Sequence, residues 1–304
     1  YKRQVATALA IARAPLWWSP PGPMRIARVL HESALTPVLA LERDGALYDV
    51  AELDRRLGTA FAPERACGPL DFHRRVIALA GAGLAELDEA LRAGIRPTAA
   101  RLLPGTFLWL PPCDESRAMF LRTEANAHDR APRYALRNPR ALMGHEASAV
   151  FPAREEEPNV EIGVAALLGE DLYRATAEEA DRAIFGYAIL GDWIARAGQT
   201  RDFATQLGPV LVTKDEAGDV ASLRIASNLA SDSCVGEARF SIAESVAFAS
   251  DRLQLRAGDV IGAGAVVRVP APFGTVVEAS IERLGKLTGR AVRGPEPVDW
   301  RHAG

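Results

Sequence analysis

The chain has 304 residues, enough for one large domain or for one large and one small domain. Hydrophobic residues make up 48% and charged residues 25%, which is typical of a globular protein and excludes a disordered or fibrous chain. The net charge of −3, without a run of Lys or Arg, predicts neither nucleic acid nor an anionic membrane as a partner. No segment approaches the ~20 consecutive apolar residues of a membrane-spanning helix.

The cysteines are few and far apart. Cys67, Cys113 and Cys234 are odd in number and lack the spacing of a zinc cluster or a disulfide framework. The composition therefore indicates a reducing compartment, and we predict a cytoplasmic protein.

Residues 1–23 are predicted to be an N-terminal extension without ordered structure. Their short apolar run is interrupted by Arg13 and followed by a Pro-Pro-Gly-Pro sequence, without a small-residue cleavage site typical of a signal peptide. The first strand is expected directly after Met24.

Residues 24–112 have the pattern of a small α+β domain. Strands are predicted at 25–30, 38–42 and 46–50, and Asp44-Gly45 between the last two indicates a hairpin. Helices are predicted at 51–57 and 71–93, the second from apolar residues at helical spacing. A further strand at 106–110 ends at two prolines.

Residues 113–304 are dominated by strand-like runs, which predict a curled, mixed β architecture. Thr176 and Glu179 form a capping-box pattern that opens a short helix to about residue 183. Strands are expected at 160–169, 185–190, 210–213, 222–226, 259–261, 265–269 and 274–281.

Two acidic residues, Glu161 and Asp192, lie within strongly apolar runs. A buried carboxylate is costly unless its charge is compensated. A divalent cation with oxygen ligands would provide that compensation. Ion pairs with nearby arginines are the alternative.

Five segments occur in an order that carries a family resemblance. They are NVE at 159–161, GYAILGDWIAR at 186–196, LGPVLVTKDE at 207–216, FSIAE at 240–244 and LRAGDVIGAG at 255–264. This series resembles the fumarylacetoacetate hydrolase family, with the similarity clearest from residue 134 onward. The resemblance implies an α+β fold: a mixed β-roll of the family's C-terminal type, here at 113–304, with the small N-terminal α+β domain at 24–112.

The resemblance also implies a metal site. The family takes two glutamates from an E-x-E strand and one aspartate from the next motif, which correspond to Asn159, Glu161 and Asp192. Alternate strand residues share a face, so Asn159 and Glu161 point the same way. The amide can still ligate a hard cation, but one negative charge is lost. We therefore expect weakened binding of Mg²⁺, with Mn²⁺ or Ca²⁺ as alternatives.

Substrate and catalytic groups follow from the same resemblance. Arg137, Arg196, Gln199 and His145 are predicted to bind substrate. Arg201 stands near the position of a family lysine and is predicted to assist catalysis by its charge, although it cannot exchange a proton near neutral pH.

The proton-transfer group has the weakest sequence signal. His128 and Glu124 would form an i, i+4 pair if their segment were helical, with Glu124 orienting a histidine base. Both residues could equally be solvated.

The implied activity is that of a metal-dependent hydrolase or lyase (decarboxylase) acting on a small 2-oxo acid or an acylpyruvate-like 1,3-dicarbonyl. Two alternatives stay open: a non-catalytic protein that binds a ligand or partner on this fold, and a hydratase or isomerase on the same scaffold. The resemblance further implies a homodimer.

Overall fold

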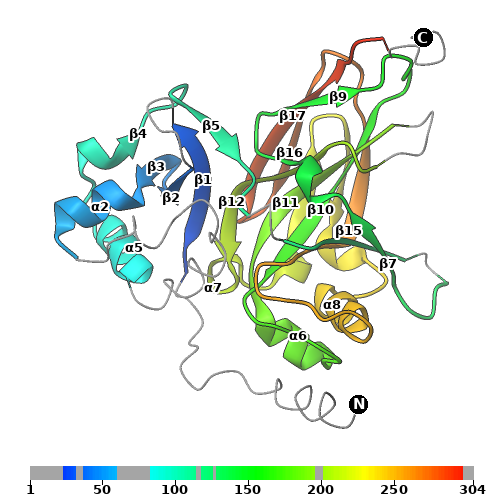
Figure 1. Cartoon of the computed structure of the whole chain (residues 1–304), viewed down its shortest axis with the longest axis horizontal. Coiled ribbons are helices and arrows are strands. Elements are labelled where there is room, and N and C mark those ends of the chain that lie inside the picture. The colour runs from blue at the N-terminus through cyan, green and yellow to red at the C-terminus, as the bar shows by residue number, and fades with distance from the viewer. Residues whose placement is uncertain are drawn as a thin grey trace, which may run out of the picture.

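The computed structural model describes residues 23–31, 37–59, 83–113, 118–125, 128–195 and 201–296, and within them the side chains of Glu124, Ser231 and residues 264–266 are not described (Figure 1). The predicted extension at 1–22, most of the predicted helix at 71–93, and the residues Cys67, Arg196 and Gln199 lie outside the described residues.

The described part of the N-terminal unit is a small antiparallel sheet with two α-helices, and the helix predicted at 51–57 is confirmed as α2. Its strands are β1 (Arg25–His31), β2 (Val38–Arg43), β3 (Ala46–Asp49), β4 (Arg101–Leu102) and β5 (Phe107–Leu110), and its helices are α2 (Val50–Leu57), α5 (Ala85–Arg92) and the 3-10 turn η2 (Thr98–Ala100). Asp44 and Gly45 both have positive φ, 52° and 74°, which closes the tight β2–β3 hairpin. The Asp49 carboxylate caps α2 by accepting the backbone N–H groups of Ala51 and Glu52.

The larger unit is a roll built on a curled sheet. Its strands are β6 (Phe120–Glu124), β7 (Arg133–Arg137), β8 (Leu142–Met143), β10 (Asn159–Leu168), β11 (Ile184–Ile194), β12 (Thr205–Thr213) and β15 (Val260–Pro270). Neighbouring strands follow the order β12-β11-β10-β15-β6-β7. After β7 a 3-10 turn, η3 (Pro139–Ala141), leads into β8, which pairs with β12 in parallel. The chain thus returns from one end of this series to the other and curls the sheet.

A second, five-stranded sheet packs beside the first in the order β14-β13-β16-β17-β9. Its strands are β9 (Ser148–Phe151), β13 (Arg224–Ser227), β14 (Ala230–Cys234), β16 (Val276–Ile281) and β17 (Gly285–Arg293). The helical elements of this part are α6 (Ala177–Ala183), α7 (Lys214–Ala217), η5 (Val220–Ser222), η6 (Val235–Glu237) and α8 (Ile242–Ser250).

Both longer helices of the roll begin with reciprocal capping boxes. Thr176 and Glu179 open α6 as the sequence predicts, and Ser241 and Glu244 open α8 in the same way. The fold is therefore α+β, with strands dominating the roll.

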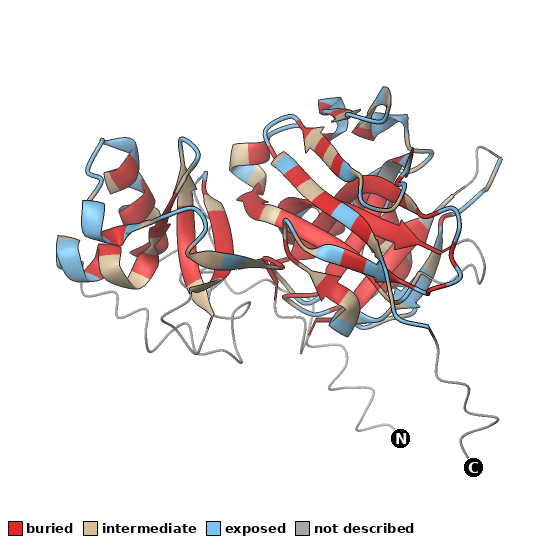
Figure 2. Ribbon diagram, turned by 90° about the horizontal axis from the view of Figure 1, so that it is seen from above, coloured by how far each residue is buried: buried red, intermediate tan, exposed pale blue. Residues whose placement is uncertain are grey.

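The two units share one sheet. β1 pairs antiparallel with β12, with Ile26 opposite Leu211, so the N-terminal strands continue the 12-stranded sheet of the roll. Buried residues run through both lobes in Figure 2. The N-terminal strands and the roll therefore share a continuous sheet, and the domain boundary expected at residues 112–113 stays a prediction.

Several elements differ in length from the prediction. The runs at 259–261 and 265–269 form the single strand β15, and the strand expected at 185–190 extends through Asp192 as β11. The run at 222–226 divides into η5 and β13. Among the described residues, no helix is long and apolar enough to cross a membrane.

Candidate active site

The two buried acids predicted from the sequence lie directly opposite each other. Glu161 on β10 is the register partner of Asp192 on β11, and the two residues are 6% and 0% exposed. Side chains at such paired positions have Cβ atoms about 5 Å apart, and two like charges there are destabilising. The pair therefore requires positive charge nearby.

Four register partners on adjacent strands place polar groups beside the two carboxylates. Thr205 on β12 pairs with Asp192, and Arg268 on β15 pairs with Glu161. In order across β12-β11-β10-β15, these partners are Thr205, Asp192, Glu161 and Arg268. Since register partners lie side by side on one face, strand pairing alone brings a hydroxyl and a guanidinium to the carboxylates.

Two arginines hold Glu161. Arg201 donates from Nη1 to Oε2 at 2.7 Å, and Arg268 donates from Nη2 to Oε1 at 2.5 Å. Both carboxylate oxygens are thus engaged in charge-assisted hydrogen bonds, the stronger kind of hydrogen bond in proteins. The sequence-based alternative of ion pairing with arginine is confirmed for Glu161.

The carboxylate of Asp192 has fewer hydrogen bonds than that of Glu161. Thr205 Oγ1 donates to its Oδ1 at 3.2 Å. Arg137 Nη2 and Arg201 Nη1 lie 3.7 and 3.9 Å from Oδ2, within ion-pair range, yet among the described residues the buried Oδ2 has no hydrogen-bond partner. A buried acceptor without a donor is unusual in a native structure and calls for an explanation such as a bound ion.

Curling of the roll brings in the remaining charges. Arg137 ends β7, immediately before the turn that returns the chain to β12, and its guanidinium reaches across to Asp192. Arg122 on β6 is 2% exposed and acts on both carboxylates through its charge.

The facing acids have opposite pKa shifts. Burial by itself raises the pKa of Glu161, but the hydrogen bonds from Arg268 and Arg201 outweigh it and leave the pKa below its usual value. Burial raises the pKa of Asp192, and the nearby arginines offset only part of that effect. The ionised form of Asp192 is thus less stabilised by its surroundings than the ionised form of Glu161.

The structure gathers four of the predicted site residues: Glu161, Asp192, Arg137 and Arg201. Asn159 begins β10 on the same strand face as Glu161 but is turned toward the chain entering the strand, where its Nδ2 donates to the carbonyl oxygen of Glu157 at 2.7 Å.

The expected helical pairing of Glu124 with His128 is wrong. Glu124 is the last residue of strand β6, and His128 is exposed in a turn of the β6–β7 connection. In a helix, residues four apart lie on one face and can contact each other, whereas the extended end of β6 and the following turn do not provide that geometry. The role of Glu124 and His128 in proton transfer stays a prediction, and helical pairing no longer supports it.

His145 lies apart from the carboxylates. The side chain of Gln206 donates to the carbonyl oxygens of Gly144 and Ala147, which flank His145 in its loop. The side chain of the preceding residue, Thr205, donates to Asp192. Consecutive strand residues point to opposite faces of a sheet, so this loop and Asp192 belong to opposite faces of β12. The structure therefore does not bring His145 to the carboxylate pair, where it was predicted to bind substrate.

Sequence reasoning missed Arg122, Arg268 and Thr205. Arg268 had a signal, because it is a charged residue inside the apolar run at 265–269. Arg122 and Thr205 could be assigned to the site only after the pairing of their strands was known.

The donor set fits a hard dication in part. Two facing carboxylates and the unpartnered Oδ2 of Asp192 are oxygen donors of the type that Mg²⁺, Mn²⁺ and Ca²⁺ prefer. Within the described residues no third carboxylate, histidine or cysteine joins them. The Asn159 amide oxygen would therefore have to contribute, as the sequence predicts.

Together these features define a β-roll protein with a buried polar centre inside the curled sheet. Residues 112–292 match the family model described as fumarylacetoacetate (FAA) hydrolase C-terminal. This match covers more than half of the chain, which therefore belongs to the fumarylacetoacetate hydrolase family.

Relatives and solved structures agree with that assignment. A mitochondrial oxaloacetate tautomerase of Homo sapiens is 27% identical over 176 residues, which cover 50% of this chain and 56% of that protein. An uncharacterized protein of Archaeoglobus fulgidus is 28% identical over 165 residues, 50% of this chain and 66% of that protein. The chain thus matches little more than half the length of the tautomerase.

Among solved structures, maleylpyruvate hydrolase from Sphingobium sp. SYK-6, in complex with manganese(II) and pyruvate, has a TM-score of 0.69 at 21% identity and covers 90% of this chain and 100% of that one. A 2-hydroxyhepta-2,4-diene-1,7-dioate isomerase from Mycobacterium marinum has a TM-score of 0.66 at 18% identity with the same coverage. At these identities the likeness shows the fold.

Proposed function

We propose that the chain is a metal-assisted enzyme acting on a small 2-oxo acid or acylpyruvate-like 1,3-dicarbonyl, by hydrolysis or decarboxylation. The observation that carries this proposal is the buried Oδ2 of Asp192, opposite Glu161, which has no hydrogen-bond donor in the part of the chain that the structure describes. The manganese and pyruvate held by the maleylpyruvate hydrolase of the same fold support it.

In this proposal Asp192, Glu161 and the Asn159 amide oxygen hold the ion, with Mg²⁺, Mn²⁺ or Ca²⁺ as candidates. When bound, such an ion polarises a carbonyl and stabilises an enolate as a Lewis acid. The loss of one carboxylate at Asn159 predicts an affinity in the micromolar to low-millimolar range rather than tighter.

The arginines provide substrate recognition. Arg268 is the most accessible of them, with 60% of its side chain exposed, whereas the Arg137 side chain is 10% exposed. Arg268 therefore meets an incoming carboxylate first, and Arg201 and Arg137 lie deeper. Guanidinium groups suit carboxylates because they bind them through two parallel hydrogen bonds.

The proton-transfer group is not an arginine, since guanidinium does not deprotonate near neutral pH. His128 and Glu124, in and beside the β6–β7 connection, stay the proposed pair for that role. Arg196 and Gln199 stay proposed substrate ligands. The homodimer and the cytoplasmic location likewise stay predictions.

A second candidate is a metal-free protein that binds an organic anion and catalyses nothing. The specific observation in its favour is that both oxygens of Glu161 are already bonded by Arg201 and Arg268. Guanidinium charge would then replace the ion, and an anionic ligand would bind by exchanging with Glu161.

A third candidate is an isomerase or hydratase on the same scaffold, favoured by the oxaloacetate tautomerase and the diene-dioate isomerase among the similar proteins. Such an enzyme would exchange protons at the substrate carbon, or add water, without splitting the carbon skeleton. Mass spectrometry of the products in deuterated water distinguishes it from a hydrolase or decarboxylase.

Calorimetry with Mg²⁺, Mn²⁺ and Ca²⁺ tests the metal. We expect one site on the wild type, lost in Asp192→Asn and kept in Asp232→Asn, a matched control whose acid forms an exposed ion pair with Arg224. Oxalate is added as an enolate mimic in a second titration. Absence of metal binding to the wild type in both titrations would refute the metal-assisted mechanism, and oxalate binding alone would support the anion-binding protein.

A further inference from the structure

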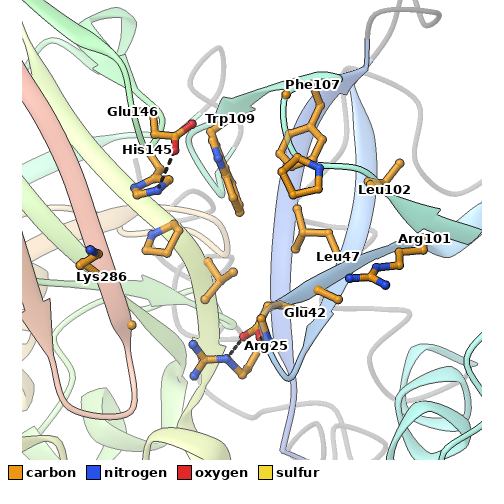
Figure 3. Close-up of a pocket in the computed structure, with 17 residues that line it drawn as sticks. Arg25, Glu42, Leu47, Arg101, Leu102, Phe107, Trp109, His145, Glu146 and Lys286 are labelled. Carbon is orange, nitrogen blue, oxygen red and sulfur yellow. Dashed lines mark hydrogen bonds and ion pairs between the residues drawn. The ribbon is translucent and has the colours of Figure 1, made fainter.

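A cavity lies between the two lobes, apart from the carboxylate pair. It has a volume of about 380 Å³, within the range of small-molecule sites. Figure 3 shows Leu47 and Arg101 of the N-terminal unit on one side and His145 and Lys286 of the roll on the other. Neither Glu161 nor Asp192, nor any arginine of their site, is among its lining residues.

The upper wall of the cavity in Figure 3 is aromatic. Phe107 and Trp109 alternate on β5 and so share a face, with ring centroids 5.4 Å apart at an interplanar angle of 80°. His145 lies edge-on to Trp109 at 5.1 Å. Leu47 and Val210 add aliphatic surface. Such walls suit a flat, apolar ligand body, because aromatic rings favour edge-to-face and offset contacts.

The charged lining groups leave a small positive excess, because Arg25, Arg101 and Lys286 stand against Glu42 and Glu146. Arg25 is paired with Glu42 and also donates to the carbonyl oxygen of Arg283. Arg101 is exposed, and its side chain forms no hydrogen bond or ion pair with the described residues. It is therefore available to an anionic ligand.

Lys286 provides a second cation on the opposite wall. Its ammonium lies 3.0 Å from Glu278, but the two side chains are 55% and 44% exposed. An exposed pair of this kind contributes only about 0–1 kcal/mol, so an incoming anion can exchange with it at little cost.

His145 adds a neutral donor. Its Nδ1 accepts the backbone N–H of Thr288 at 3.0 Å, which places the ring proton on Nε2. Its Nε2 lies 3.7 Å from Oε1 of Glu146, whose side chain is 65% exposed. Because an exposed contact of this kind is weak, Nε2 can donate to a ligand oxygen instead, while Nδ1 anchors the ring to β17.

We propose that this inter-lobe cavity binds a small aromatic carboxylate, with its ring against Phe107 and Trp109 and its carboxylate attracted by Arg101 and Lys286 on the opposite walls. The inference is independent of the metal site, because the two sites share no lining residue. Binding would tie β4 to β17 and thereby stabilise the arrangement of the two lobes.

Calorimetry with benzoate tests the cavity, with benzamide as its uncharged counterpart. We expect one saturable benzoate site and at least tenfold weaker binding of benzamide. Arg101→Gln and Lys286→Gln should each weaken benzoate severalfold, and the double variant at least tenfold. Arg290→Gln is the matched control, an exposed arginine of β17 that does not line the cavity.

Asp192→Asn separates this site from the proposed active site, and we expect it to bind benzoate like the wild type. The proposal is overturned by absence of saturable benzoate binding, by equal affinity for benzamide, or by an equal loss in Arg290→Gln. A change of benzoate affinity in Asp192→Asn, in either direction, would also overturn it, by assigning the anion to the arginines around the carboxylate pair. A dimer that Arg101→Glu converts to monomers would also overturn the proposal, by showing that a second copy covers the cavity.

Discussion

The facing acids at the centre of the roll predict that two isosteric substitutions have unequal effects on stability. Glu161→Gln leaves Arg201 and Arg268 without their carboxylate, whose oxygens lie 2.7 and 2.5 Å from the two guanidinium groups. Asp192→Asn removes a charge whose Oδ2 has no hydrogen-bond donor and keeps an oxygen for Thr205. The first change should therefore cost more than the second.

The size of the effect follows from burial. Removing one partner of a buried ion pair costs about 3–5 kcal/mol. The Arg201 side chain is 22% exposed, but that of Arg268 is 60% exposed, so solvent screens its share. We therefore expect Glu161→Gln to lower the free energy of unfolding by about 2–3 kcal/mol and Asp192→Asn to change it by at most about 1 kcal/mol.

Urea denaturation in EDTA at pH 7 measures both values without a bound metal. The control is Glu278→Gln, which removes the exposed pair with Lys286 and should cost no more than about 1 kcal/mol. Since the pKa of Glu161 is lowered in the folded state, its contribution is present above the ordinary value of 4.5 and is lost as the pH falls below it. The difference between wild type and Glu161→Gln should therefore shrink in acid.

A larger loss in Asp192→Asn than in Glu161→Gln would refute this reasoning. It would mean that the arginines stabilise Asp192 more than burial penalises it. The unpartnered Oδ2 would then cease to be an argument for a bound cation.

Three further predictions concern the face of β12 opposite the carboxylate pair. Gly144→Ala should destabilise the fold by about 1–3 kcal/mol, because an added Cβ would lie 2.2 Å from the Trp109 carbonyl oxygen; an unchanged melting temperature would contradict this close approach. Burial lowers the pKa of His145, so protonation costs the native state, and wild type should lose stability relative to His145→Gln as the pH falls from 7.5 to 5.5 in urea titrations; parallel pH profiles would contradict the burial effect. Trp193→Phe removes the 3.0 Å hydrogen bond from Nε1 to Gln206 Oε1 and should cost about 1–3 kcal/mol in the same assay, whereas a neutral result would show that another donor reaches that oxygen.

The sequence by itself determined the local elements and their order. Asp44-Gly45 marked the first hairpin, and the Thr176–Glu179 capping box marked α6, because both signals depend on neighbouring residues alone. The five ordered motifs indicated the family, which the match over residues 112–292 confirms. Glu161 and Asp192 stood out because charges are rare in apolar strands.

Other features were decided by pairings between distant parts of the chain. The direct opposition of Glu161 and Asp192 depends on the β10–β11 register, and a shift of one residue would have sent one acid to the other face. Arg268 joined the site because β15 pairs with β10. Arg137 reached it because the chain after β7 returns to pair with β12.

The tertiary structure also separated residues that the sequence had grouped. His145 was predicted to bind substrate from the family resemblance, but Gln206 holds its loop on the opposite face of β12 from Asp192. Glu124 and His128 were paired on a helical spacing in a segment that forms the end of a strand and a turn. Sequence spacing fixes which residues are available, whereas strand register and closure of the roll fix which of them meet, because those depend on contacts far apart in the chain.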